Sequence, residues 1–205
     1  MPARQESCCF TGHRPAKLPW GYNERDPRCV RLKERIADAV LLAYQEGYRH
    51  FLCGMAQGCD LYFCEAVLAL RERYQEVTVE AAIPCPTQAD AWPEAERDRY
   101  RELVARCDME TMVSDTYSST CMQRRDRYMV DHAMLLIAAF DGTIARYSSV
   151  TTTADPAGPA TRWNTPCGGE SRFLMCRFPR NSCKMKLLYC IDARRGSSSE
   201  RAWMV

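Results

Sequence analysis

The sequence predicts an α/β fold, in which an open parallel sheet carries helices on both faces. Two observations lead to this prediction. Short runs of aliphatic and β-branched residues, such as "VTVEAAI", alternate along the chain with longer segments whose apolar residues recur at nearly helical spacing. Glycine follows two of the early runs, "CCFTG" and "FLCG". Strands that alternate with helices form parallel sheets, because each connecting helix carries the chain back to the same end of the sheet.

Five strands and four helices are expected in the first 142 residues. The strands are expected at residues 7–11, 48–54, 77–83, 109–115 and 134–142, and the helices at 24–46, 60–74, 87–106 and 121–133. Thr87 is expected to cap the third helix, and Gly47 to end the first. The first helix has the clearest pattern, with apolar residues at Val30, Leu32, Ile36, Ala39, Val40 and Ala43.

Charge and hydropathy exclude several classes of protein. The 28 Lys and Arg residues nearly balance the 26 Asp and Glu residues, so the net charge of +2 creates no strong field that would attract nucleic acid or an anionic membrane. The longest apolar run, at residues 133–140, is too short to span a bilayer, and the first residues lack the apolar core of a signal peptide. A cytoplasmic protein without a membrane partner is therefore expected.

The 13 cysteines do not predict a metal site. No Cys-x-x-Cys motif occurs, Cys8 and Cys9 are adjacent, and the spacing of Cys53, Cys59 and Cys64 matches no common zinc motif. Several cysteines lie in apolar stretches, where reduced cysteine behaves as a small hydrophobic residue. We expect reduced core cysteines, no metal and no cofactor.

The pattern changes after residue 142. Residues 5–142 are expected to form one domain, whereas residues 143–205 contain scattered Pro and Gly and almost no periodicity, apart from the modest apolar run "KLLYCI". We expect a poorly structured, mostly irregular C-terminal tail. Formation of a homo-oligomer is left open.

Polar residues follow the first and fifth strands, where parallel sheets bind ligands. Thr11 offers a hydroxyl and Gly12 a close backbone approach, while His13 and Arg14 are donors suited to phosphate or carboxylate. Asp141 and Gly142 are expected at the same edge. The alternative is a turn in which His13 is satisfied locally and Arg14 forms a surface ion pair.

The loop "GMAQGCD" follows the second strand. Gly54 and Gly58 permit a sharp turn and a close approach to a ligand, and Asp60 is placed to cap the next helix or to bind a ligand hydroxyl. A tight turn with an Asp cap explains the same residues without a ligand. Glu65 either points back toward a ligand or is a solvated helix residue.

The segment "QRRDRYMVDHA" has two interpretations. Its arginines form a solvated helix face that pairs with the nearby aspartates, or one Arg and Tyr128 reach the ligand edge and contact a phosphate and a base or ribose.

Taken in order, "CCFTGHRPAKLP", "FLCGMAQGCDLYFCEAVL", "AAIPCPTQADAWPEAERDRYRELVARCD" and "YSSTCMQRRDRYMVDHAMLLIAAFDG" resemble the YpsA-like family of the SLOG superfamily, which has Rossmann-like folds. That superfamily includes DprA-type DNA-processing proteins and LOG-type phosphoribohydrolases. The resemblance covers residues 5–142. It implies a nucleotide or nucleotide-derived ligand, met by Gly12, His13, Arg14, Gly54, Gly58 and Asp60, and it draws attention to Trp92, Arg127 and Tyr128.

The resemblance leaves three functions to compare. A nucleotide-binding sensor is the first expectation. A LOG-like N-glycosidic hydrolase would use Asp60 or Glu65 as its carboxylate, but the LOG-type glycine-rich phosphate loop with its glutamate is missing. A DprA-like module for single-stranded DNA is disfavoured by the near-neutral net charge.

The tail departs from the family pattern. There, a Gly-Gly-Thr turn, a helix and a last strand follow the "DG", whereas this chain continues "TIARYSSVTTTADPAG". Translation of "ADPAGPATRWNT" one nucleotide later permits a family-like helix end and strand. We therefore hypothesise that residues beyond about 143 are out of frame, which sequencing of the gene would test.

Overall fold

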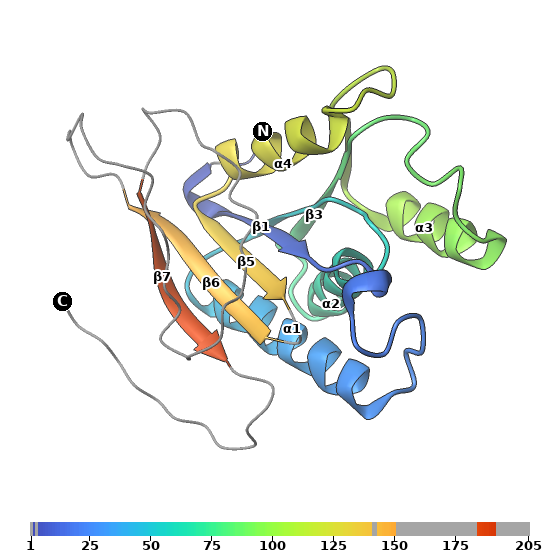
Figure 1. Cartoon of the computed structure of the whole chain (residues 1–205). Helices are drawn as coiled ribbons and strands as arrows, with labels where there is room; N and C mark the ends of the chain where they lie inside the picture. The colour runs from blue at the N-terminus through green and yellow to red at the C-terminus, as the bar shows by residue number, and fades with distance from the viewer. Residues whose placement is uncertain (1, 3, 141–142, 151–183, 192–205) are drawn as a thin grey trace, which may run out of the picture.

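The computed structural model describes residues 2, 4–140, 143–150 and 184–191. In this part of the chain, strands and helices alternate as predicted (Figure 1). The parallel strands are β1 (Ser7–Gly12), β2 (His50–Cys53), β3 (Thr78–Ile83), β4 (Met109–Met112) and β5 (Leu135–Phe140). The helices are α1 (Pro27–Gln45), α2 (Cys59–Arg71), α3 (Glu94–Arg106) and α4 (Cys121–Asp131), with short 3-10 turns η1 (Arg4–Glu6) and η2 (Pro15–Lys17). The α/β fold with a parallel sheet is confirmed.

The direction in which the chain crosses the sheet reverses beside β1. The parallel strands lie in the order β4-β3-β2-β1-β5, so the chain moves outward from β1 to β4 and then returns to β5 on the other side of β1. Because such crossovers are almost always right-handed, this reversal places α4 on the face opposite α1 and α2. Figure 1 shows α4 above the sheet and α1 and α2 below it. Helices on both faces are thus confirmed.

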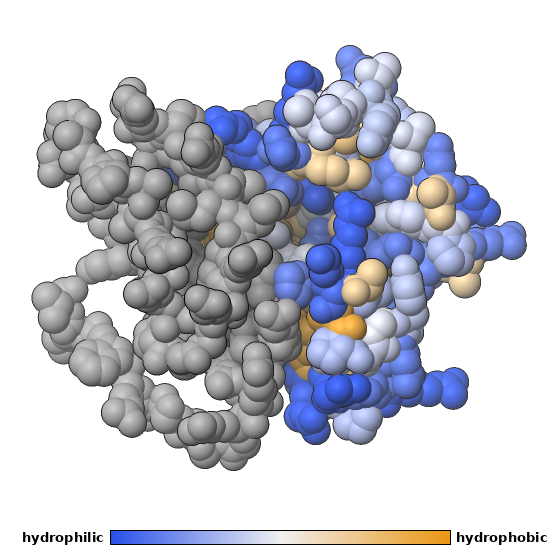
Figure 2. Space-filling view, in the orientation of Figure 1, coloured by the Kyte–Doolittle hydropathy of each residue, from blue (hydrophilic) through white to orange (hydrophobic). Residues whose placement is uncertain are grey.

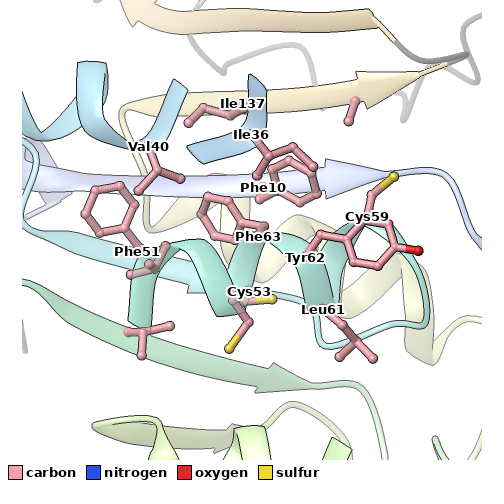
Figure 3. Packing of buried hydrophobic residues seen from close by; sticks show 14 of the residues in the cluster. Phe10, Ile36, Val40, Phe51, Cys53, Cys59, Leu61, Tyr62, Phe63 and Ile137 are labelled. Atoms are coloured by element: carbon pink, nitrogen blue, oxygen red, sulfur yellow. The ribbon is translucent and has the colours of Figure 1, made fainter. Parts of the chain in front are cut away.

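Each face of the sheet has its own hydrophobic cluster. The larger cluster lies between the sheet and α1 and α2, where the rings of Phe10 and Phe63 stack with their centroids 4.5 Å apart (Figure 3). The smaller one packs Cys9, Leu52 and Met129 beneath α4. Complete burial of a large apolar side chain contributes about 1.5–3 kcal/mol to stability. In Figure 2, the described surface is mostly hydrophilic.

The start of α1 follows local capping chemistry. Asp26 is the N-cap and accepts a hydrogen bond from the Arg28 amide at 2.8 Å, and Pro27 occupies the first turn, where a missing amide proton costs nothing. Val30 was expected on the apolar face but is exposed, and Cys29 is buried instead. The spacing of three and four residues between buried positions holds from Cys29 onward.

The expected start of α3 at Thr87 is wrong. Residues 87–92 form turns, and α3 begins at Glu94 with Pro93 as its N-cap. A proline inside a helix would remove a hydrogen bond and clash with the preceding turn, and it also disfavours helical backbone at Trp92. The proline therefore delays the helix by seven residues relative to the prediction.

Two segments of residues 143–205 form strands, which differs from the irregular structure expected there. β6 (Thr143–Val150) pairs antiparallel with β5, and β7 (Lys184–Ile191), which contains the run "KLLYCI", pairs antiparallel with β6. The unpaired backbone groups of an edge strand such as β5 favour the addition of further strands. The remaining residues of the tail lie outside the described part of the chain.

None of the helices in the described part of the chain is long and apolar enough to cross a bilayer.

Candidate functional site

The loops after β1 and β2 meet at one edge of the sheet, beside the end of β5. The His13 amide donates to the Ala139 carbonyl at 3.1 Å, and the Cys59 amide donates to the His13 carbonyl at 3.2 Å. Gly58 has a φ of +85°, and a Cβ there would lie 2.9 Å from the His13 carbonyl oxygen and from Pro15 Cδ. Glycine is required at this position both by backbone conformation and by space.

Gly12 has a packing role at this edge. It pairs with Ala139 of β5, and a Cβ on Gly12 would overlap the Cβ of Cys59 in the first turn of α2. The missing side chain therefore lets α2 lie close to the end of β1. Thr11, one residue earlier, is half-buried.

Cationic groups lie on the outer side of the β1 loop. Arg14 and Lys17 are exposed, and His13 is half-buried. The Arg14 guanidinium has a weak contact with Met122 Sδ in α4, at 3.9 Å from Nη2. The N-cap of α2 is Gly58, and no side chain of the described residues caps this end of the helix. The acidic side chain in the first turn of this helix is that of Asp60, which lies near the positive end of the α2 dipole.

Asp60 is not the N-cap of α2, and its side chain is buried. It lies inside the first turn of the helix, is only 5% exposed, and accepts a hydrogen bond from the Ala56 amide at 3.2 Å. Burial raises the pKa of Asp60 to about 6, although Arg125 and the Ala56 amide oppose the shift. The expectation that Asp60 caps the helix is therefore wrong, and its carboxylate faces the interior of the loop.

Arg125 completes this buried polar cluster. It projects from α4, is 6% exposed, and lies 3.6 Å from the Asp60 carboxylate. Its Nη1 donates to the Gly54 carbonyl, and its Nε donates to Asp126 at 2.9 Å. A Cβ on Gly54 would overlap the Arg125 guanidinium, so the glycine makes room for the arginine rather than for a ligand.

Sequence reasoning missed Arg125 as a buried residue. The pattern contained one signal, because Cys121, Arg125 and Met129 recur every four residues and all three face the sheet. Apolar partners four residues away on both sides identify the buried stripe of a helix. Arg127 lies outside this stripe and is exposed.

Gln88 supports the same loop from the β3 side. Its Nε2 donates to the Met55 carbonyl at 2.6 Å and to the Gly54 carbonyl at 3.3 Å, and the residue is 8% exposed. Met55 has a φ of +53°, which is unusual for a residue other than glycine. Three buried polar side chains, from α2, α4 and the turn after β3, thus contact the backbone of residues 54–56.

Glu65 forms ion pairs within the protein. Its Oε1 lies 2.7 Å from Arg99 Nη2 and also accepts from Arg99 Nε at 2.9 Å. Arg99 also pairs with Glu24 at 2.6 Å, so α2 and α3 are tied to the segment before α1. The carboxylate of Glu65 is thus bound to α3 rather than directed at the edge of the sheet.

Tyr128 lies over the face of the sheet and not with the loops at its edge. Its hydroxyl donates to Glu80 Oε1 at 2.6 Å, and Thr111 donates to the same oxygen at 2.7 Å. His50 Nε2 lies 3.0 Å from the other carboxylate oxygen. Glu80 is 5% exposed, and the Tyr128 ring also lies against the ring of His132, with centroids 4.2 Å apart. Trp92 packs edge-on against Tyr100, with ring centroids 5.4 Å apart.

Asp141 and Gly142, which were expected at the same edge, lie outside the described residues. Among the residues that are described, no group of three or more His, Cys, Asp or Glu side chains could hold a metal ion.

The reversal of strand order beside β1, with polar loops at the strand ends, defines a Rossmann-like α/β protein. The chain belongs to the YspA SLOG family, because the model of that family, YpsA, matches residues 8–154. It is 21% identical over 134 residues to a UPF0398 protein of Lysinibacillus sphaericus, covering 64% of this chain and 74% of the relative.

Two relatives from Bacillus subtilis are similar to the chain at the same level. The uncharacterized SPbeta prophage-derived protein YoqJ is 24% identical over 133 residues, which cover 58% of this chain and 77% of YoqJ. The UPF0398 protein YpsA is 23% identical over 134 residues, which cover 64% and 74%. The resemblance inferred from the sequence motifs is thus confirmed. None of these three names states a ligand or a reaction.

Proposed function

We propose that the chain binds an anionic nucleotide or nucleotide-derived small molecule at the edge of the sheet between β1 and β5. One observation carries the proposal: the strand order reverses between these two strands, and Thr11, Gly12, His13 and Arg14 lie where β1 ends. Neighbouring loops diverge at such a reversal, and open α/β sheets bind ligands there. The SLOG superfamily resemblance supports a nucleotide as the class of ligand.

Three groups would hold the ligand anion. Arg14 is exposed and presents a planar fork of donors that matches phosphate or carboxylate. His13 adds a second side chain with ring nitrogens. The N-terminus of α2 adds the positive end of the helix dipole, although its first amide, that of Cys59, already donates to the His13 carbonyl and Asp60 lies in the same turn.

The buried cluster would act as a support and would not touch the ligand. Arg125, Asp60 and Gln88 contact residues 54–56 from inside, so the loop keeps its shape before a ligand arrives. A loop ordered in advance loses less conformational entropy on binding. Gly54 and Asp60 therefore enter the proposal as positioning residues.

Binding is better supported than glycosidic hydrolysis. A hydrolase needs a carboxyl group that reaches the substrate. Asp60 is buried beneath the loop, and Glu65 is paired with Arg99, so neither of the two candidate carboxylates is presented at the edge.

Thermal unfolding of the full chain with and without ligand tests the proposal. The probes are AMP, NAD, ADP-ribose and inorganic phosphate, with adenosine as the matched uncharged control. A ligand present at 100 times its dissociation constant stabilises the folded state by about 2.7 kcal/mol, which raises the melting temperature measurably. We expect a rise with at least one phosphorylated probe and a smaller one, or none, with adenosine. The absence of a shift with all four phosphate compounds would overturn the proposal.

A further inference from the structure

Two cysteines from different helices face each other away from the proposed ligand site. Cys64 lies in α2 and Cys107 is the C-cap of α3, and their sulfurs are 3.9 Å apart. Cys64 is fully buried, whereas Cys107 is half-buried, so one thiol of the pair reaches the solvent boundary. This combination of an accessible thiol and a buried partner is the arrangement found at redox-sensitive cysteine pairs.

The geometry is compatible with a disulfide after a small movement. A disulfide has a sulfur–sulfur bond of about 2.05 Å, so the two sulfurs must approach by about 2 Å. Cys107 has an extended backbone, with φ −69° and ψ 150°, and follows the last turn of α3. Its side chain therefore belongs to the connection to β4. The Cys107 thiol donates to the Leu103 carbonyl at 3.2 Å, and this hydrogen bond is lost when the sulfur moves toward Cys64.

The surroundings favour Cys107 as the first thiol to react. A hydrogen bond from Cys64 lowers the pKa of the Cys107 thiol, and Arg71 acts in the same direction, while burial and two nearby carboxylates oppose the shift. The pKa of Cys64 is raised, chiefly because the loss of its proton would break that hydrogen bond, and a hydrogen bond with Cys53 and burial act in the same direction. Thiolates, and not thiols, react with oxidants, so Cys107 is the nucleophile and Cys64 the resolving thiol.

A second pair provides an internal comparison. The sulfurs of Cys85 and Cys121 are also 3.9 Å apart, but both residues are fully buried. The two pairs have the same sulfur separation and differ in access to solvent. Of these two pairs, therefore, only that of Cys64 and Cys107 can be reached by an oxidant dissolved in water.

We propose that Cys64 and Cys107 form a reversible disulfide that links α2 to the end of α3 under oxidation by a peroxide. The Cys107 thiolate attacks one oxygen of hydrogen peroxide, the O–O bond breaks, and hydroxide leaves, which gives the sulfenic acid. Cys64 then attacks the sulfenic sulfur, the S–S bond forms, and hydroxide leaves and combines with the Cys64 proton. The sulfurs lose two electrons to one peroxide, and two waters form in total.

Peptide mapping of the full chain tests this proposal. The reduced protein is treated with a small excess of hydrogen peroxide, its remaining thiols are alkylated in denaturant, and it is digested with trypsin without a reductant. Cys64 lies in tryptic peptide 50–71, Cys85 in 74–97, and both Cys107 and Cys121 in 107–124. We expect a linked species of 50–71 with 107–124 that dithiothreitol abolishes.

Variants assign the link to its two sulfurs. Cys107→Ser and Cys64→Ala should each abolish the linked species, and Cys121→Ser should leave it at the wild-type level. In Cys64→Ala, Cys107 should be trapped as the sulfenic acid by a dimedone-type probe. Linkage of 107–124 to 74–97 in place of 50–71, or a link that survives in Cys64→Ala through another cysteine of 50–71, would overturn the proposal. So would oxidation of Cys107 to the sulfinic acid with no linked species.

Discussion

The guanidinium of Arg125 fills the space that a side chain on Gly54 would need, and its Nη1 donates to the Gly54 carbonyl. These two residues are 71 positions apart and join α4 to the loop between β2 and α2. A Cβ on Gly54 would also lie 2.8 Å from the Asp60 carboxylate. The absence of a side chain at position 54 therefore allows a buried positive charge, its carboxylate partner and the loop backbone to come together.

Gly54→Ala should destabilise the fold by about 1–3 kcal/mol, the usual range for overpacking a closely packed interior. The added methyl group would push the Arg125 guanidinium away from the carbonyl and from Asp60. Urea unfolding followed by circular dichroism measures the loss. If the overlap is the cause, the same substitution should cost much less in an Arg125→Ala background, because that variant has no guanidinium to displace. Equal costs in both backgrounds would show that Arg125 is not the reason for the glycine.

Asp60→Asn should change how stability depends on pH. The folded state raises the pKa of Asp60 from 3.8 to about 6, chiefly through burial. A raised carboxyl pKa means that the folded state holds the proton more tightly, so this contribution to stability is complete below pH 3.8 and is lost as the pH rises to about 6. A shift of this size corresponds to about 3 kcal/mol.

The Asp60→Asn variant has no carboxyl group at position 60, so it does not lose stability through this group as the pH rises. Its free energy of unfolding, relative to that of the wild type, should increase by about 2.4 kcal/mol between pH 4 and pH 7, on top of a constant offset from the altered contact with Arg125. Denaturant unfolding at several pH values measures the difference, and Asp38→Asn, at an exposed position on α1, controls for the removal of one negative charge. A difference that stays constant with pH would contradict the prediction.

The sequence was sufficient for the parts of the fold that depend on local patterns and on topology. Apolar residues at helical spacing predicted α1, and the alternation of strands and helices predicted a parallel sheet, which in turn placed the residues after β1 and β2 at one edge. The strand pairing of residues 143–150 was not predicted, because the pairing partner of an edge strand is set by tertiary contacts and only weakly by local preference.

The roles of the polar residues could not be predicted in the same way. In "QRRDRYMVDHA", a buried arginine and an exposed one look alike until the neighbouring backbone is known. Arg125 is buried because the Gly54 carbonyl and Asp60 provide its partners, and a buried charge needs such partners. Asp60 and Tyr128 were likewise expected to meet a ligand, yet their contacts are with the protein itself.

Tyr128→Phe should cost about 1.5–3 kcal/mol of stability, because it removes one of the hydrogen bonds to a buried charged carboxylate. Burial opposes ionisation of Glu80, but hydrogen bonds from His50, Tyr128 and Thr111 outweigh it and lower the pKa of Glu80 to about 2. The stability from this lowered pKa is present above pH 4.5 and is lost as the pH falls toward 2.

Loss of the Tyr128 hydroxyl should therefore move acid unfolding to a higher pH, which a pH titration followed by circular dichroism would detect. Tyr117→Phe is the matched control, since Tyr117 is 68% exposed and should behave as the wild type does. An unchanged acid midpoint in Tyr128→Phe would mean that the hydroxyl does not stabilise the ionised form of Glu80.

Arg14→Ala should weaken ligand binding while leaving the fold intact. Arg14 is exposed, and its one described hydrogen-bond contact is the weak one with Met122, so its removal should change the free energy of unfolding by less than about 0.5 kcal/mol. A charge-assisted hydrogen bond to a ligand phosphate contributes about 1.5–3 kcal/mol, so the dissociation constant of a phosphorylated ligand should rise by about one to two orders of magnitude.

Arg101→Ala removes an exposed arginine from α3, far from this edge in sequence, and should leave the dissociation constant unchanged. Isothermal titration with the ligand that gives the largest thermal shift compares the three proteins. Equal affinities for wild type and Arg14→Ala would remove Arg14 from the proposed anion site.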